Sequence, residues 1–597
     1  MGKPHIISIV LNAHLPFARQ CGPPRLRHAQ SGSSQTAAED GPSVPVPHPH
    51  QEAPFHLDGL LQMGSAPPSC CPGGSEVQPE TPARHLPRIK LSVEEQWFFE
   101  ALSDTYLPLL EVFDHLEKDH VPFRLGISFS PLLCYMLQDE CLLSHYLNYV
   151  DKQIEFGVRE MERMEKNPDL HALARVYYDR AVDKRILFTE RYEGNILNIF
   201  NYYQKKGRLE ILTTAATHAF LPVYTAYPEA VQAQIEVALS SFRHTFGKVP
   251  HGFWLPELGW SPELDAYLRA YSFGYTIADT HAGLLRNPET SRGSFYPVKT
   301  PSQTLVLFRD FRAYRDIQDP EIGYRFSPVY RDSLADAGFE LPADRVEPFL
   351  NASQGRVKTG YAYYTNGGRG QKKQVYDPAL AESLVREQAL SFLDARFSTL
   401  CKAEKLGGPD PISLCACNAD AFGRFWYEGP RFLEALFREG AVRQDLRFLT
   451  PGEYFCRQDR QTMASSMPEF SSWGFNGYAE PWIDASNDWM YPHVIHSIER
   501  MLELAERFPN DTGLKERALN QAAREILLVQ ASDWPRMLFK QEYAGYARRQ
   551  IEMALRNFTT IYEALGSNYI STEWLTNLER RHNFFPDINY RVFRRKH

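Results

Sequence analysis

The chain has 597 residues, a formal net charge of −8 and 43% hydrophobic residues, a composition typical of globular proteins. With a sequence pI of about 6.2, it has no electrostatic basis for binding nucleic acid or an anionic membrane surface, so we expect neither partner. No apolar run reaches the roughly 18 residues of a membrane-spanning helix, and the run Ile6–Leu11 is too short for a signal-peptide core.

The cysteines indicate a reducing location. There are nine, scattered along the chain. The pairs Cys70-Cys71 and Cys415-x-Cys417 lack the spacing of zinc ligands, so no metal site is expected from them. This usage favours a cytoplasmic protein without a disulfide framework.

The amino-terminal part predicts one strand followed by an irregular segment. Residues 1–20 contain the apolar run Ile6–Asn12, which we assign as the first strand of the fold. Residues 21–88 are rich in Pro, Ser and Gly, and such a composition cannot bury enough apolar surface to offset chain entropy. We therefore expect a disordered insertion there. A helix is predicted to begin near Ser92, which can act as N-cap while Glu95 completes a capping box.

Residues 89–470 alternate between strand and helix patterns, which predicts parallel strands in a sheet or barrel. Helical patterns span residues 228–246 and 378–397, the latter with Asp377 as cap and Pro378 in its first turn. Apolar runs that end in polar residues predict the strands, at Ile6–Asn12, Phe123–Ser128, Glu210–Thr214, Val249–Leu255, Phe273–Ala278 and Ile412–Cys417.

The carboxyl-terminal third predicts a helical domain at residues 471–597. The strand signal fades after Tyr478, and amphipathic patterns follow. The helices are expected at residues 489–508, 514–530 and 541–565.

Polar residues follow several predicted strands, which is where barrel proteins place their sites. Glu257 stands out because it lies between Trp254 and Trp260, and a lone carboxylate among aromatic residues is costly to bury without a role or a partner. Aromatic walls suit sugar rings, and a carboxylate suits the oxocarbenium-like charge of glycosyl transfer. The alternative is a strand end with chance tryptophans. The polar residues after the strands are His14, His218, Glu257, Asp279 with His281, and Asn418.

Five ordered segments together resemble glycoside hydrolase family 57, and within it the 1,4-α-glucan branching enzymes. They are LNAHLPF (residues 11–17), THAFLP (217–222), GFWLPE (252–257), NADAFGRFWYEGP (418–430) and SWG (472–474) with Trp482 and Trp489. Further matches are ASDWP (531–535) and NFFPDI (583–588). The resemblance covers nearly the whole chain except the insertion.

The resemblance implies an α/β fold, an incomplete (β/α)7 barrel followed by a C-terminal α-helical domain. It also implies retaining chemistry on α-1,4-glucans, with no metal or organic cofactor and with α-glucan or another saccharide as partner. Retaining enzymes place two carboxyl groups about 5–5.5 Å apart, one to attack the anomeric carbon and one to protonate the leaving oxygen and then activate the acceptor. In a branching enzyme the acceptor is a glucan 6-hydroxyl.

The two catalytic positions differ in how well they match. Glu257 stands at the family's nucleophile position, whereas the family's acid/base aspartate falls on Asn418. An amide has no acidic proton near neutral pH, and losing a general acid typically costs about 10²–10⁴-fold in rate. Asp420 would share the face of Asn418 if the strand continued, which makes it a candidate substitute. Asn12 stands where the first motif usually has a histidine.

The resemblance also implies a set of substrate-binding residues. Phe326 and Glu542 replace a glycine and a glutamine of the family pattern. Taken without the family, a histidine or a tryptophan of this set fits a packed core equally well, and Arg309 fits a surface ion pair. The residues are His14, His218, Trp254, Arg309, Phe326, Trp473, Trp482, Asp533 and Glu542.

Three functions follow from these observations. The first is a retaining, branching-type enzyme acting on α-1,4-glucan. The second is a catalytically impaired homologue that binds glucan or a related saccharide, as the changes at Asn12, Phe326, Asn418 and Glu542 suggest. The third is a metal-dependent carbohydrate deacetylase on a similar barrel, which would need a His/Asp metal set that Asn12 depletes by one ligand.

Overall fold

The computed structural model describes residues 3–18, 90–289, 292–352, 355–367 and 373–595. The insertion expected at residues 21–88 lies outside the described residues. No helix within the described ranges is long and apolar enough to cross a membrane.

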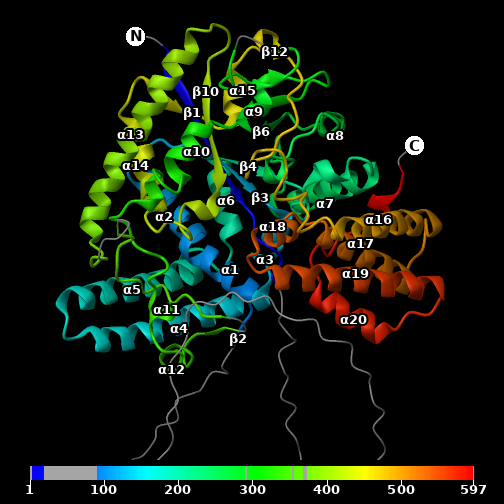
Figure 1. The fold of residues 1–597 in the computed structure, drawn as a ribbon, viewed down its shortest axis with the longest axis horizontal. Coiled ribbons are helices and arrows are strands. Elements are labelled where there is room, and N and C mark those ends of the chain that lie inside the picture. The colour runs from blue at the N-terminus through cyan, green and yellow to red at the C-terminus, as the bar shows by residue number, and fades with distance from the viewer. Residues whose placement is uncertain (1–2, 19–89, 290–291, 353–354, 368–372, 596–597) are drawn as a thin grey trace, which may run out of the picture. The chain divides into compact units, whose positions relative to one another are not determined.

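Seven parallel strands form the centre of the fold (Figure 1). No ladder joins the two outer strands of this series in the described part of the chain, although the amide of Asp310 reaches the carbonyl of Leu414 at 2.8 Å. The expected α/β fold with an incomplete barrel is thereby confirmed. In spatial order the strands are β10 (Ile412–Asn418), β1 (His5–Ala13), β3 (Leu125–Phe129), β4 (Leu209–Thr213), β5 (Gly252–Phe253), β6 (Tyr275–Ala278) and β8 (Leu305–Phe308).

Short strands extend this sheet and form a second one. Of them, only β7 runs antiparallel to its neighbour β8. None of these short strands was predicted, because two or three residues leave no period in the sequence. They are β7 (Val298–Lys299), β11 (Leu446–Phe448) and β12 (Ala464–Ser465) in the main sheet, and β2 (Lys90–Leu91) paired with β9 (Asn351–Ala352).

The strand at the candidate nucleophile is shorter than expected. The sequence predicted Val249–Leu255, but β5 spans only Gly252–Phe253. Pro250 and Pro256 flank it, and because proline has no backbone N–H it cannot extend the ladder on either side. Glu257 therefore follows the shortest strand of the seven.

Helices cover the barrel, and several begin as the sequence predicted. Ser92 caps α1 (Val93–Ala101) in a capping box with Glu95. The helix α7 (Pro228–Phe246) has the predicted bounds, whereas α13 (Pro378–Glu404) continues beyond the expected end. The other principal barrel helices are α2 (Leu107–Lys118), α3 (Pro131–Met136), α6 (Ile196–Lys205), α8 (Leu264–Ala270), α10 (Phe311–Gln318), α14 (Gly429–Ala441) and α15 (Pro451–Arg457). Two long helices, α4 (Glu140–Met164) and α5 (Pro168–Ile186), follow β3 and precede β4 along the chain. They pack against each other.

The carboxyl-terminal helices lie beside one another, coloured orange to red (Figure 1). Gln541 and Tyr543 both have left-handed backbone, with φ of 56°, so the predicted helix 541–565 begins only at Ala544. The antiparallel bridge between Ala219 and Ala531 brings this region against the barrel. The helices are α16 (Met490–Arg507), α17 (Leu514–Val529), α18 (Asp533–Lys540), α19 (Ala544–Gly566) and α20 (Thr572–Arg581).

Candidate active site

Glu257 lies in a strained turn directly after β5. Its φ is 60° and that of Leu258 is 50°, both in the left-handed region, where a non-glycine residue costs about 1 kcal/mol or more. Backbone hydrogen bonds hold the turn. The amide of Trp473 donates to the carbonyl of Glu257 at 2.9 Å, and Trp260 and Ser471 exchange two hydrogen bonds of 2.8 and 3.1 Å. Strain of this kind persists where the surrounding structure enforces it, as at catalytic sites.

Two hydrogen bonds hold the Glu257 carboxylate. The indole Nε1–H of Trp473 donates to Oε2 at 2.5 Å, and the Ser532 hydroxyl donates to Oε1 at 2.8 Å. Glu257 as a whole residue is only 6% exposed. Burial raises the pKa of the Glu257 carboxyl above its ordinary value, opposed by the positive charge of Arg536 and by the two hydrogen bonds.

A hydrogen-bonded chain runs from Asn12 to Glu257, and its donors and acceptors alternate in one direction. Asn12 Nδ2 can only donate, so His218 Nε2 accepts at 3.3 Å and its Nδ1 carries the proton. His218 Nδ1–H then donates to Ser532 Oγ at 3.0 Å, which leaves the Ser532 proton for Glu257. Burial, first, and then the charges of His14 and Arg536 hold the pKa of His218 well below its usual range, so a neutral imidazole fits this chain.

His14 extends this cluster to the helical region. Its ring stacks on that of His218 with centroids 4.0 Å apart and an interplanar angle of 6°. Its Nδ1 lies 2.9 Å from Ser130 Oγ, and its Nε2 lies 2.9 Å from Asp533 Oδ2. The structure therefore brings together His14, His218, Asp533 and Glu257, which are far apart in the sequence.

Asn418 ends β10 and pairs in register with Asn12 of β1. Asn12 Nδ2 also donates to Asn418 Oδ1 at 3.2 Å. Because this bond engages the amide oxygen, the Nδ2 group of the exposed Asn418 is free to donate outward. Position 418 thus carries a neutral hydrogen-bond donor.

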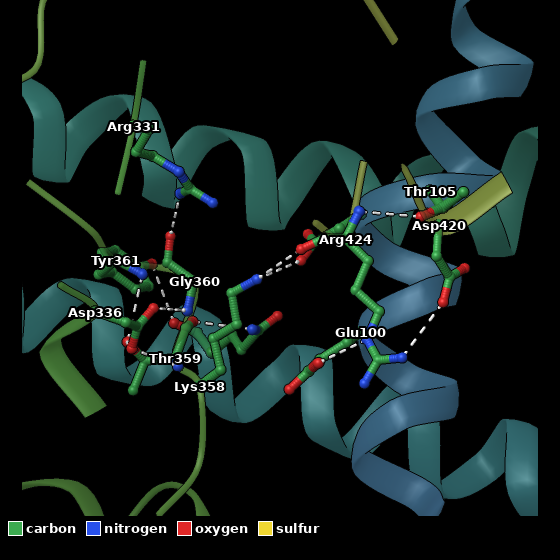
Figure 2. A network of polar contacts seen from close by, with 12 residues as sticks. Glu100, Thr105, Arg331, Asp336, Lys358, Thr359, Gly360, Tyr361, Asp420 and Arg424 are labelled. Atoms are coloured by element: carbon green, nitrogen blue, oxygen red, sulfur yellow. Dashed lines mark hydrogen bonds and ion pairs between the residues drawn. The ribbon is translucent and has the colours of Figure 1, made fainter. Parts of the chain in front are cut away.

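Asp420 lies past the end of the strand. Since β10 stops at Asn418, Asp420 falls in the 3₁₀ turn Ala419–Ala421, and the continuing strand that would align it with Asn418 is not formed. Its Oδ2 lies 3.3 Å from Arg424 Nη1, and Arg424 Nε donates to Glu100 at 3.0 Å (Figure 2). Burial raises the pKa of Asp420, and Arg424 opposes that rise. No hydrogen bond or ion pair joins Asp420 to Glu257 among the residues that the structure describes.

Arg309 and Trp254 both approach the indole of Trp473. Arg309 is buried and binds Asp279 through two hydrogen bonds of 3.2 and 2.5 Å. Its guanidinium lies 4.5 Å from the ring centroid of Tyr314 and 5.8 Å from that of Trp473. Trp254 meets Trp473 edge-on, with centroids 5.7 Å apart. These residues pack around the side chain that holds Glu257.

Three other expected substrate-binding residues form no hydrogen bond or ion pair with Glu257 in the described part of the chain. Trp482 is 1% exposed and stacks on Phe220 with centroids 5.0 Å apart. Phe326, in the 3₁₀ turn Tyr324–Phe326, is 38% exposed, with the guanidinium of Arg325 4.3 Å from its ring. Glu542 is exposed just after α18. Phe326 and Glu542 can therefore contact a bound molecule only outside the Glu257 cluster.

Sequence reasoning missed Ser532, which joins His218 to Glu257. Its position inside the recognised ASDWP segment was the available signal, but serine alone carries no mark of such a contact. Within the described ranges, no group of three or more His, Cys, Asp or Glu side chains is arranged to hold a metal ion.

Sequence comparisons find related proteins and two matching sequence models. A sequence model described as glycosyl hydrolase family 57 matches residues 82–463, and one described as 1,4-alpha-glucan branching enzyme, C-terminal, matches residues 493–593. The chain is 25% identical over 545 residues to the 1,4-alpha-glucan branching enzyme TK1436 of Thermococcus kodakarensis, which covers 84% of this chain and 76% of that protein.

Solved structures show the same fold. The alpha-amylase AmyC from Thermotoga maritima has a TM-score of 0.81 and 30% identity, and the match covers 100% of both chains. The GH57-type branching enzyme from Pyrococcus horikoshii has a TM-score of 0.77 and 22% identity over 100% of this chain and 98% of that one. TK1436, solved in complex with glucose, has a TM-score of 0.77 and 21% identity over 100% and 97%.

Proposed function

This chain belongs to glycosyl hydrolase family 57, and on that premise we propose that it is a retaining, branching-type enzyme acting on α-1,4-glucan, with Glu257 as nucleophile. The observation that carries the proposal is the two-point hold on Glu257 by Trp473 and Ser532. Both donors stabilise the ionised carboxylate and fix its direction, as a nucleophile requires. That the relative TK1436 was solved with glucose supports a saccharide as the ligand.

Glu257 would attack the anomeric carbon and form a covalent glycosyl ester, while Trp473 keeps the other carboxylate oxygen in place. Asn418 would donate a hydrogen bond to the leaving oxygen but supply no proton. Cleavage of an unactivated glucan therefore has to take its proton from water, which makes it about 10²–10⁴-fold slower than with an acid at this position.

A second candidate function is saccharide binding without turnover. It is favoured by the contact between Asn12 and Asn418, because two neutral side chains pair there where the resemblance implies a histidine and an aspartate. Such a protein would keep the sugar-binding surroundings of Glu257 and lack the second catalytic group.

The test separates the two by using a donor that needs no protonation. α-Maltosyl fluoride and amylose would be given to the wild type and to Glu257→Gln, with fluoride release and new branch points measured. We expect fluoride release by the wild type alone, faster with azide, which attacks the glycosyl ester without needing a base. Equal fluoride release by both proteins would remove the nucleophile assignment. Amylose binding with no fluoride release would establish the second function instead.

A further inference from the structure

The basic side chains of Arg536 and Lys540 form a column with Ser532, the hydrogen-bond partner of the candidate nucleophile. Ser532, Arg536 and Lys540 are each four residues apart, so they lie on one face of α18. The amide of Arg536 donates to the carbonyl of Ser532 at 3.4 Å, and Ser532 Oγ lies 2.8 Å from Glu257. Arg536 and Lys540 are both exposed. The column therefore leads from the Glu257 carboxylate to solvent.

Arg325 approaches the same column from the barrel side. Its Nε is buried and has no hydrogen-bond partner. Lys540 is within electrostatic range of both Arg325 and Arg536, and burial together with these two charges lowers the pKa of Lys540. Three cations from two distant parts of the chain thus converge beside the site.

No close ion pair neutralises these cations among the described residues, although the charge of Arg536 acts on Glu257. In the described part of the chain, none of the three forms an ion pair within 4.0 Å, and Glu542 is the carboxylate whose charge acts on Lys540. The whole chain carries a net charge of −8, so an unpaired basic cluster is unusual for its composition. Like charges at close range repel, and an anion bound between them removes that cost.

The second observation concerns the leaving group. Asn418 can donate a hydrogen bond but no proton. A substrate suited to this site therefore has a leaving group that departs without being protonated. We propose, on the basis of the function proposed above, that the donor substrate is an α-glycosyl ester of phosphoric or diphosphoric acid, with Arg325, Arg536 and Lys540 binding its phosphoryl oxygens. Guanidinium and ammonium groups are the usual protein ligands of phosphate.

The chemistry balances without a general acid. A phosphate monoester has a second pKa of about 6, so its monoanion is present near neutral pH. Glu257 attacks C1, the C1–O bond breaks, and its electron pair leaves with hydrogen phosphate, which keeps its own proton. A glucan hydroxyl then attacks C1, the ester bond to Glu257 breaks, and the hydroxyl proton passes to hydrogen phosphate. The products are a lengthened or branched glucan, dihydrogen phosphate and the free carboxylate.

The test compares three donors on the full-length protein: α-maltosyl fluoride, α-maltosyl phosphate and a nucleoside diphosphate glucose. We expect turnover of the fluoride and of one phosphoryl donor, and which of the two is used identifies the source. Turnover of the fluoride with neither phosphoryl donor consumed would overturn this inference and leave the proposed function standing. No turnover of any donor would overturn both.

Charge-neutral variants then test the cations themselves. In Arg325→Gln/Lys540→Gln, which keeps Arg536 because its charge acts on Glu257, we expect kcat/KM for the phosphoryl donor to fall about hundredfold, roughly tenfold for each charge-assisted contact, with the fluoride nearly unaffected. The matched control is Arg548→Gln, which removes an exposed arginine that pairs with Glu552 at 3.1 Å and should leave both donors unchanged. An equal loss on both donors in the double variant would show a structural role and contradict the inference.

Discussion

Asn12 Nδ2 donates to Asn418 Oδ1 at 3.2 Å, so the two asparagines that we propose stand in place of catalytic-motif residues are in direct contact. The pair sits in register on neighbouring strands, β1 and β10. The same Asn12 nitrogen donates to His218, which links position 418 to the hydrogen-bonded chain that ends at Glu257. A change at either asparagine therefore acts on both candidate catalytic positions.

Asn418→Asp should raise the rate of amylose branching. The new carboxyl group supplies the missing proton, and the expected gain is about 10²-fold or more. Branch points formed per unit time measure it, and Asn418→Ala serves as the control that lacks a proton donor. Because the two side chains touch, the substitutions should not be additive. Asn12→His should change the rate by a different factor in the Asn418→Asp background than in the wild type. An Asn418→Asp protein no faster than Asn418→Ala would show that position 418 does not face the leaving group.

Fluoride release from α-maltosyl fluoride should increase with pH along a single limb. Only the ionised Glu257 attacks, and because burial raises its pKa, the midpoint should lie above the ordinary range of a glutamate. Ser532→Ala removes a hydrogen bond that favours the ionised form, so it should move the midpoint further up. A pH profile that is flat, or that is unchanged by Ser532→Ala, would contradict this view of Glu257.

His218 should make the fold sensitive to mild acid. The pKa of His218 is lowered in the folded state. Below about pH 6.5 its imidazole is therefore protonated in the unfolded chain but stays neutral in the folded chain. The free energy of unfolding should then fall with falling pH by at most about 1.4 kcal/mol per unit. Glu257 acts in the opposite sense at lower pH, since a raised folded pKa adds stability as the pH falls.

Urea titrations of the wild type and His218→Gln between pH 7 and pH 5.5 isolate the histidine. The variant should lose less stability over that interval because glutamine does not titrate. The contribution of Glu257 cancels in the comparison, since both proteins share it. Parallel losses in the two proteins would mean that His218 titrates normally in the folded state.

Arg424 should be a structural residue that also fixes Asp420. Arg424→Met leaves the buried Asp420 and the half-buried Glu100 without their cation and should destabilise the fold by about 3 kcal/mol. Adding Asp420→Asn should recover part of that loss. Thermal or urea unfolding measures both, and a cost under about 1 kcal/mol would show that the pair is solvated.

Asp420→Asn alone distinguishes an ion-pair role from an acid role. Because Arg424 ties the carboxylate, we expect equal changes in rate on amylose and on α-maltosyl fluoride. A loss confined to amylose would make Asp420 the substitute acid, since only the glucan needs a proton.

Periodic patterns allowed six of the seven barrel strands and a few of the barrel helices to be predicted, because long apolar runs and caps such as Ser92 act locally. The four-residue strand β8 was not predicted. The limits appeared where local signals stop. β5 is shorter than its apolar run because Pro250 and Pro256 flank it, and the helix expected from residue 541 begins later because Gln541 and Tyr543 turn the backbone left-handed. Recognised motifs led to Glu257, whereas its partner Ser532 became visible only through the fold.

The central claim, that Glu257 is a nucleophile, is tested most directly by mass spectrometry after mixing the protein with α-maltosyl fluoride. Without a base at position 418, the glycosyl ester should decay slowly and accumulate. We predict a mass increase of one maltosyl group, mapped by peptide digestion to Glu257 and absent in Glu257→Gln. An adduct on another residue would contradict the account. So would a wild-type protein that stays unmodified while the Glu257→Gln variant still releases fluoride.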